Sequence, residues 1–120
     1  MPATQQADIF MSTPLDDRKA RSHSYILENP TKVPVVLINN HKGIDLEKYK
    51  YLLPREFSVK KLVSMVKKVN ACRPEEALYF YANGKIVRYD WIIGDAYDLY
   101  KHEDGFLYLK MTNMPTFGKA

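Results

Sequence analysis

The last residues of the chain offer the clearest opportunity for covalent chemistry. The sequence ends MPTFGKA over residues 114–120, with Gly118 third from the end. Glycine has no side chain to pack and is costly to order, so it has no evident structural use at this position. Two interpretations follow from the residues alone. The stretch is either a frayed chain end or a chemical handle on which another enzyme acts.

Other residues with reactive side chains do not form a recognisable catalytic or metal-binding pattern. Cys72 is the one cysteine, and no histidine or acidic residue lies at a catalytic spacing from it, so we expect an inert hydrophobic residue there. His23, His41 and His102 are scattered without ligand partners, which argues against a metal site. A glycine-rich phosphate loop is absent as well. We therefore expect no enzymatic activity, no cofactor and no metal.

The segment 58–69, SVKKLVSMVKKV, carries four lysines, at positions 60, 61, 67 and 68. They have two interpretations: a solvated helix face, or a contact with an anionic partner such as membrane phosphates, an acidic protein surface or RNA. Aromatic residues that would favour nucleic acid do not interleave with these lysines, so we expect no nucleic-acid partner.

Composition limits the chain to one domain of ordinary globular type. It has 120 residues, 46% hydrophobic and 27% charged, with a formal net charge of +4. A single cysteine excludes an intrachain disulfide, which favours an intracellular location. The opening MPATQQADIF does not resemble a signal peptide, and the longest apolar run, residues 35–38, is far shorter than the ~20 residues that span a bilayer.

The pattern of apolar residues and turn signals predicts the elements that position these groups. Residues 1–12 are polar and are expected to form a flexible segment, before a ubiquitin-like domain over 13–113 and a tail over 114–120. We expect helices at 14–27, with Thr13 as N-cap, at 58–69, capped by Ser58, and at 95–100. Strands are expected at 33–38, 49–53 and 106–111, and a hairpin at 77–87 that turns at Asn83-Gly84.

Two hairpins that flank one amphipathic helix, with a last strand free to lie centrally, predict an α+β fold. The arrangement is a ubiquitin-like β-grasp sheet with one covered face and an additional N-terminal helix.

Several motifs in this order resemble the autophagy ubiquitin-like modifiers. This is the autophagy-related protein eight family, which includes microtubule-associated light chain three and the GABA-receptor-associated protein. The motifs are YKYLLP after NPTKVPVV, then ALYFYANG, YKHEDGFLYL and the terminal TFG. The resemblance covers residues 15–118 and depends on the order and spacing of the motifs together.

The resemblance implies a covalent role for the tail. A dedicated cysteine protease would remove residues 119–120. The carboxylate of Gly118 would then be adenylated, passed through thioesters on activating and conjugating enzymes, and joined to phosphatidylethanolamine. A residue without Cβ can thread a narrow channel to a catalytic cysteine, and Phe117 would anchor the tail beside it. The protein is then expected in the cytoplasm, with the conjugated form on autophagosomal membranes.

The resemblance also implies that the chain binds receptor peptides with aromatic-x-x-aliphatic motifs as an added strand on its sheet edge. The implied edge is Lys50, Tyr51 and Leu52, with Lys32 as a basic contact. The implied aromatic pocket is formed by Tyr25, Pro34, Lys50, Leu52 and Phe106. The implied aliphatic pocket is formed by Tyr51, Leu53, Pro54, Phe57, Leu62, Met65 and Val66. Leu62, Val66 and Phe106 would equally be core residues in any β-grasp domain.

The chain departs from the family pattern at Asp16–Lys19 and Arg21, so its preference for ligand charge is expected to differ. It departs also at Val87-Arg88, where many relatives have two prolines. Its divergent N-terminal region does not allow tubulin or membrane binding to be inferred. Two alternative functions remain. One is an unconjugated ubiquitin-like binding module, and the other is the related protein-conjugated autophagy modifier. The extra residues 119–120 and the YKYLLP motif count against the second alternative.

Overall fold

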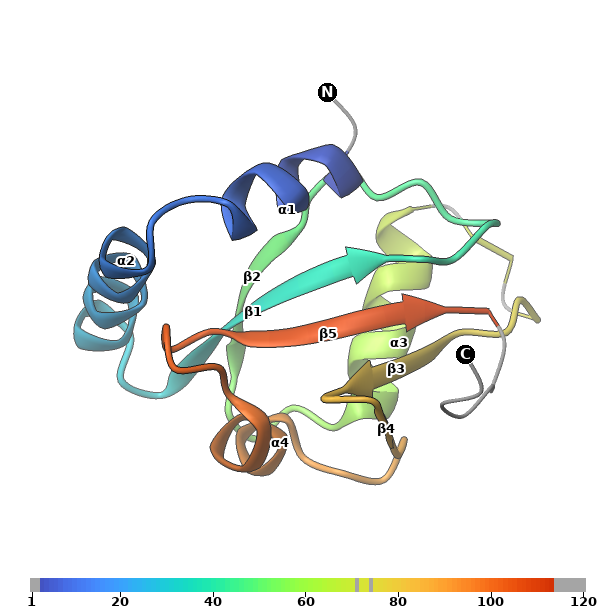
Figure 1. Ribbon diagram of the computed structural model, residues 1–120. Coiled ribbons are helices and arrows are strands. Elements are labelled where there is room, and N and C mark those ends of the chain that lie inside the picture. The colour runs from blue at the N-terminus through green and yellow to red at the C-terminus, as the bar shows by residue number, and fades with distance from the viewer. Residues whose placement is uncertain (1–2, 71, 74, 114–120) are drawn as a thin grey trace.

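The computed structural model describes residues 3–70, 72–73 and 75–113, and Figure 1 shows their arrangement. They form helices α1 (Ala3–Met11), α2 (Leu15–Glu28), α3 (Val59–Val69) and α4 (Ile93–Tyr100) and strands β1 (Lys32–Asn39), β2 (Lys50–Pro54), β3 (Tyr79–Ala82), β4 (Lys85–Val87) and β5 (Leu107–Thr112). The predicted α+β fold is confirmed, and each predicted helix and strand is present. Their ends differ from the predicted ones by up to two residues. The hairpin strands are an exception, because they are shorter than predicted.

The five strands form one mixed sheet in the order β2-β1-β5-β3-β4. The last strand, β5, lies in the middle, as predicted, and pairs in parallel with β1. The other neighbouring strands are antiparallel. At the hairpin between β3 and β4, Asn83 and Gly84 both have positive φ, 51° and 77°, which is the conformation that an Asn-Gly type I′ turn requires.

Helix α3 covers one face of the sheet because its apolar residues recur at helical spacing. Val59, Leu62 and Val66 are fully buried against the sheet, and the helix begins after Ser58, whose hydroxyl accepts a hydrogen bond from the Lys61 amide. We call the core on this face the α3-side core. Its buried members are Val33, Val35, Leu37, Ile44, Leu46, Leu53, Val59, Leu62, Val66, Leu78, Phe80, Ala82, Val87, Ile93, Ala96, Tyr97, Leu107, Leu109 and Met111.

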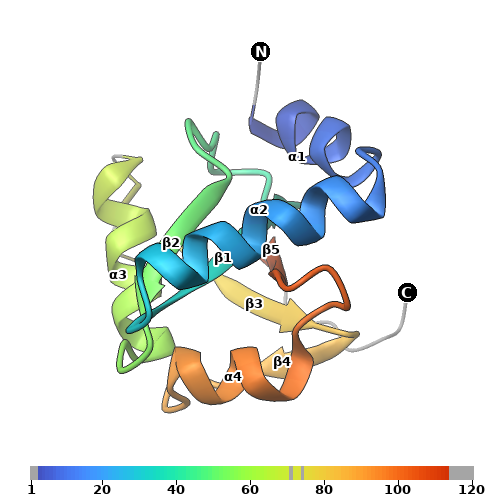
Figure 2. The same cartoon turned by 90° about the vertical axis from the view of Figure 1, so that its left-hand side faces the viewer.

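On the opposite face lies helix α1, on the side away from α3 in Figure 2, while α2 runs across the view between them. Side chains alternate along a strand, so Val36 points away from its neighbours Val35 and Leu37. Val36 packs with Phe106 and with two residues of α1, Ala7 and Phe10. We call this smaller group the α1-side cluster. It means that both faces of the sheet are covered, where the sequence predicted one covered face.

The prediction of a flexible segment over residues 1–12 was wrong, because Ala3–Met11 form helix α1. Ala7 and Phe10 lie three residues apart, on one face of the helix, and both are buried. Two buried apolar residues in a polar stretch give too weak a pattern to predict a helix, and the contacts with the sheet supply the stability.

The predicted N-cap of α2 was also wrong. Pro14 occupies that position and makes no side-chain capping bond. The carbonyl of Thr13 instead accepts a hydrogen bond of 3.0 Å from Arg18 Nε.

Candidate functional site

Strand β2 lies at one edge of the sheet and pairs on one side with β1, from Lys32↔Pro54 to Val36↔Lys50. On its other side, no strand among the described residues pairs with it. An edge strand presents unpaired backbone N–H and C=O groups to which a further strand can be added. The exposed edge expected at Lys50–Leu52 is therefore present.

A cavity of about 260 Å³ opens beside this edge strand. Its lining comes from α2, β1, β2, the loop before β2 and the residue that precedes β5. The lining residues are Tyr25, Pro34, Lys48, Lys50, Tyr51, Leu52 and Phe106. All five residues expected in the aromatic pocket line this one cavity, so the structure brings together side chains more than 80 positions apart in the sequence.

Two further residues line the cavity beyond the expected set. Tyr51 was assigned to the other pocket, and Lys48 was not singled out. The Lys48 Nζ atom lies 5.3 Å from the centre of the Tyr51 ring. The sequence did contain a signal for Lys48. It alternates with Lys50 and Leu52, and residues two apart on a strand share a face.

Lys50 occupies the centre of an aromatic cluster. Its Nζ atom lies 4.9 Å from the ring centre of Phe10, 5.7 Å from that of Tyr49 and 5.8 Å from that of Tyr25. Each distance lies within the range of a cation–π contact. The ammonium group therefore stands at the cavity wall with several ring faces around it. Together with Lys48 it makes this wall positively charged.

The residues expected in the aliphatic pocket lie on the α3 side of β2. Leu53, Leu62 and Val66 are almost fully buried in the α3-side core. Tyr51, Phe57 and Met65 are partly buried and pack against that core. The partly buried residues and Pro54 lie at the surface, while the buried three lie beneath them. That this surface is an aliphatic pocket stays a prediction.

Lys32 begins β1 and faces Pro54 across the ladder, so it lies beside the far end of the edge strand from Lys50. Its side chain is half-buried. This position is compatible with the basic contact, which stays a prediction. Phe117 and Gly118 lie outside the described residues.

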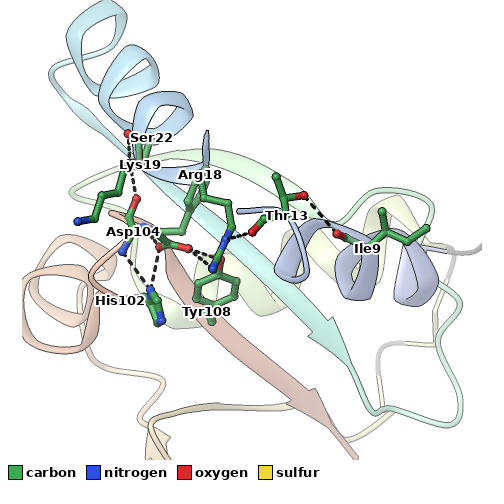
Figure 3. Close-up of polar contacts among 9 residues, drawn as sticks. Ile9, Thr13, Arg18, Lys19, Ser22, His102, Asp104 and Tyr108 are labelled. Carbon is green, nitrogen blue, oxygen red and sulfur yellow. Dashed lines mark hydrogen bonds and ion pairs between the residues drawn. The ribbon is translucent and has the colours of Figure 1, made fainter. Parts of the chain in front are cut away.

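A buried polar network holds α2 against the loop before β5, as Figure 3 shows. The Asp104 side chain is 0% exposed and lies at its centre. Arg18 Nη1 of α2 lies 2.7 Å from Asp104 Oδ2, and the Tyr108 hydroxyl donates to the same oxygen at 2.5 Å. The Phe106 amide donates to the other carboxylate oxygen at 2.9 Å. One carboxylate oxygen thus has a charged and a neutral donor and the other has a backbone amide, which compensates the buried group for its lost hydration.

The same network brings α2 very close to Gly105. The Ser22 hydroxyl lies 2.5 Å from the carbonyl oxygen of Asp104. Gly105 has φ of +90°, and a Cβ at this position would lie 2.2 Å from Ser22 Oγ. Only glycine combines this backbone conformation with this approach. As a result Tyr25, one turn after Ser22, faces Phe106 with ring centres 6.2 Å apart.

The ionisation of the network follows from its burial. Burial raises the pKa of the Tyr108 phenol, and the hydrogen bond to Asp104 raises it further. The hydrogen bond with Tyr108 is the largest influence that raises the pKa of the Arg18 guanidinium. At neutral pH the phenol is thus a neutral donor to the Asp104 carboxylate. The network is a structural support for the cavity and was not predicted from the sequence, in which Asp104 is one acid among fourteen acidic residues.

Among the residues that the structure describes, no group of three or more histidine, cysteine or acidic side chains could hold a metal ion. In the same part of the chain, no helix is long and apolar enough to cross a membrane.

Comparison with known proteins identifies relatives over nearly the whole chain. Residues 17–118 match the family model described as "Autophagy protein Atg8 ubiquitin like". Autophagy-related protein 8i of Arabidopsis thaliana is 33% identical over 107 residues, which cover 87% of this chain and 92% of that protein. Autophagy-related protein 8 of Dictyostelium discoideum is 32% identical over 108 residues, 88% of each chain. The crystal structure of Trypanosoma brucei ATG8 is similar with a TM-score of 0.80 at 30% identity, covering 90% of this chain and 95% of that one.

Proposed function

Because this chain belongs to the Atg8 family of autophagy ubiquitin-like proteins, we propose that it is a lipid-conjugated modifier that captures receptor peptides. Its peptide ligands carry an aromatic-x-x-aliphatic motif, and its membrane anchor is phosphatidylethanolamine joined to Gly118. The protein itself catalyses no reaction in this scheme, and its partners are the processing protease, the activating and conjugating enzymes, and the receptors. It is cytoplasmic until conjugation places it on autophagosomal membranes.

The observation that carries the peptide-binding proposal is the cavity of about 260 Å³ beside the unpaired edge of β2. A peptide that adds a strand to β2 gains backbone hydrogen bonds along the edge and can place one side chain in the cavity. The lining of tyrosine, phenylalanine, proline and leucine with a lysine ammonium suits an aromatic ring. The positive wall favours acidic residues next to that ring in the peptide.

The second ligand side chain would lie further along β2, against the surface formed by Tyr51, Phe57 and Met65. An extended peptide rises about 3.3 Å per residue. The two anchors of an aromatic-x-x-aliphatic motif are three residues apart, so they are separated by about 10 Å. A peptide with its anchors in this order runs parallel to β2, so Lys32, beside Pro54 at that end of the strand, is close to the C-terminal part of the peptide.

Affinity for one peptide should be modest. Burying two apolar side chains contributes roughly 1.5–3 kcal/mol each, and ordering of the peptide cancels part of this. A dissociation constant on the order of micromolar follows. Many copies anchored on one membrane would convert weak contacts into stable capture by raising the effective concentration. Conjugation and peptide binding thus support one another functionally.

The peptide-binding proposal is tested with two matched leucine variants. Leu52→Ala removes a side chain that lines the cavity, while Leu99→Ala removes one that is 65% exposed on α4. With a fluorescent Trp-x-x-Leu peptide, we expect Leu52→Ala to weaken binding about tenfold and Leu99→Ala to leave it unchanged. Equal affinity for all three proteins would contradict this site.

The conjugation proposal rests on the terminal FGKA sequence and on family membership, and the family match ends at Gly118. The test is the intact mass of the protein after incubation with extract of the source cells. Loss of residues 119–120 from wild type but not from Gly118→Ala is the expected result. An unchanged wild-type mass, while a control substrate is cleaved, would leave an unconjugated binding module. A Gly118 adduct on a protein amine, in place of the lipid, would instead indicate a protein-conjugated modifier.

A further inference from the structure

Helix α1 packs directly behind the cavity through Phe10. The Phe10 side chain is 3% exposed and belongs to the α1-side cluster with Val36 and Phe106. Its ring centre lies 5.1 Å from that of Phe106 in an edge-to-face arrangement. A second ring, that of Tyr49, lies 6.1 Å away. This is a packed aromatic contact rather than a loose approach of a terminal helix.

Phe10 also contacts the charged wall of the cavity. Lys50 Nζ lies 4.9 Å from the Phe10 ring centre, the shortest of its three ring contacts. Phe106 and Lys50 line the cavity, whereas Phe10 is absent from its lining. Any influence of Phe10 on a ligand must therefore pass through these two residues.

We propose that Phe10 is a positioning residue for the aromatic cavity, so that docking of α1 and occupation of the cavity by a ligand ring favour each other. With α1 docked, one side of Phe106 and the ammonium of Lys50 are held by the Phe10 ring. With α1 undocked, the Phe106 ring loses the nearer of its two edge-to-face partners and keeps Tyr25. Lys50 loses the shortest of its three ring contacts, so its ammonium is held less firmly at the wall. The ligand therefore meets a more ordered cavity in the docked state than in the undocked one.

Thermodynamic linkage makes this coupling reciprocal. If docked α1 raises the affinity of the cavity for a ligand ring by some factor, a bound ring raises the stability of α1 docking by the same factor. The inference rests on the proposed peptide-binding function, because it concerns how that site is formed. It adds that a helix lying outside the ubiquitin-like core sets the affinity of the site.

The test is a double-mutant cycle between α1 and the peptide. Wild type, Phe10→Ala and Ile9→Ala are each titrated with a Trp-x-x-Leu peptide and with its Ala-x-x-Leu counterpart. Ile9 is the matched control, because it is the neighbouring helix residue and its side chain is 54% exposed. We expect Phe10→Ala to weaken binding of the Trp peptide about three- to tenfold and to leave binding of the Ala peptide unchanged. Ile9→Ala should affect neither.

A loss that is equal for both peptides, or no loss at all, would overturn the inference, because a merely structural role for Phe10 would not distinguish the two ligands. If wild type does not prefer the Trp peptide to the Ala peptide, or if Leu52→Ala binds the Trp peptide as tightly as wild type does, the proposed function fails instead. The two failures are thus distinguishable within one set of titrations. Should Phe10→Ala not fold, Phe10→Leu, which keeps apolar volume without a ring, carries the same comparison with an expected loss of about twofold.

Amide hydrogen exchange provides the reciprocal measurement. Saturation of wild type with the Trp peptide should slow exchange at Ala7–Met11 by at least the factor found for Phe10→Ala in the titrations. Saturation with the Ala peptide should not slow it. Unchanged exchange in α1 with the Trp peptide bound would contradict the coupling.

Discussion

The two faces of the sheet are built in different ways. The α3-side core is a large set of aliphatic side chains closed by an amphipathic helix. The face opposite is covered by the α1-side cluster and by the Asp104 network, in which aromatic rings, a buried carboxylate and a lysine ammonium outnumber the aliphatic side chains. The first face is closed, and the second leaves the cavity beside β2 open.

This contrast indicates that one face mainly provides stability and that the other also provides the binding cavity. Aliphatic packing is dense and tolerates few gaps, so it supplies stability but little room for a ligand. Rings and polar groups with fixed partners hold a hollow open because each is oriented by specific contacts. If this is correct, disruption of the α3-side core away from β2 and the proposed aliphatic surface should affect stability alone, while disruption of the other face should affect stability and binding together.

The largest effect is expected from Arg18→Met, which leaves Asp104 buried without its cationic partner. Removal of one partner from a buried ion pair costs about 3–5 kcal/mol. Urea unfolding should show this loss of stability. Because the network also fixes α2, the affinity for the Trp-x-x-Leu peptide should fall in protein that is still folded. A normal affinity in the folded variant would separate the network from the cavity.

Leu109→Ala makes the corresponding change in the α3-side core. The Leu109 side chain is fully buried in the middle strand, so truncation leaves a cavity and should lower the free energy of unfolding by about 2–5 kcal/mol. Urea unfolding measures this loss too. Peptide affinity per folded molecule should remain that of wild type. A weaker peptide affinity would contradict the proposed independence of the two faces.

Gly105→Ala probes the close approach between α2 and the loop before β5. The positive φ of Gly105 and the nearby Ser22 hydroxyl both oppose a Cβ, so we expect a loss of roughly 1–3 kcal/mol. Gly84→Ala is the matched control: it also has positive φ, 77°, but nothing lies within 4 Å of an added Cβ. Thermal unfolding should therefore show the larger loss for Gly105→Ala. Equal losses would mean that the loss of stability comes from the backbone conformation and not from the close approach of α2.

The smallest expected effect is on alkaline stability. The pKa of Tyr108 is raised in the folded state, so above about pH 10 the unfolded chain loses its phenolic proton while the folded chain retains it. The contribution of Tyr108 is therefore complete below pH 10 and is lost as pH rises through the folded pKa. In Tyr108→Phe, the free energy of unfolding should fall less steeply above pH 10 than in wild type. The same slope in both proteins would exclude Tyr108 as a cause.

Much of the α3 side was predictable because local sequence patterns encode it. The spacing of Val59, Leu62 and Val66 gave the helix, Ser58 its start, and Asn83-Gly84 the hairpin turn. The resemblance to a family supplied the residues of the aromatic pocket, and those five residues do line one cavity. Whether they bind a peptide stays a prediction.

The other side depended on contacts that leave little trace in the sequence. Phe10 and Ala7 become a helix face only when Val36 and Phe106 cover them. Asp104 becomes a buried anchor only because Arg18, 86 positions away, reaches its carboxylate. A single aromatic residue or a single acid has no periodicity, so its environment is decided by the chain segments that fold against it.

The sequence by itself thus determined the helix and strand types, the hairpin turn and the order of elements, because these follow from short-range spacing and backbone preferences. Only the tertiary structure decided that residues 3–11 form a helix, that Lys48 and Tyr51 join the cavity, and that Asp104 and Phe10 support it from behind. The physical reason is that burial and charge pairing are properties of surfaces brought together, and these surfaces come from positions far apart along the chain.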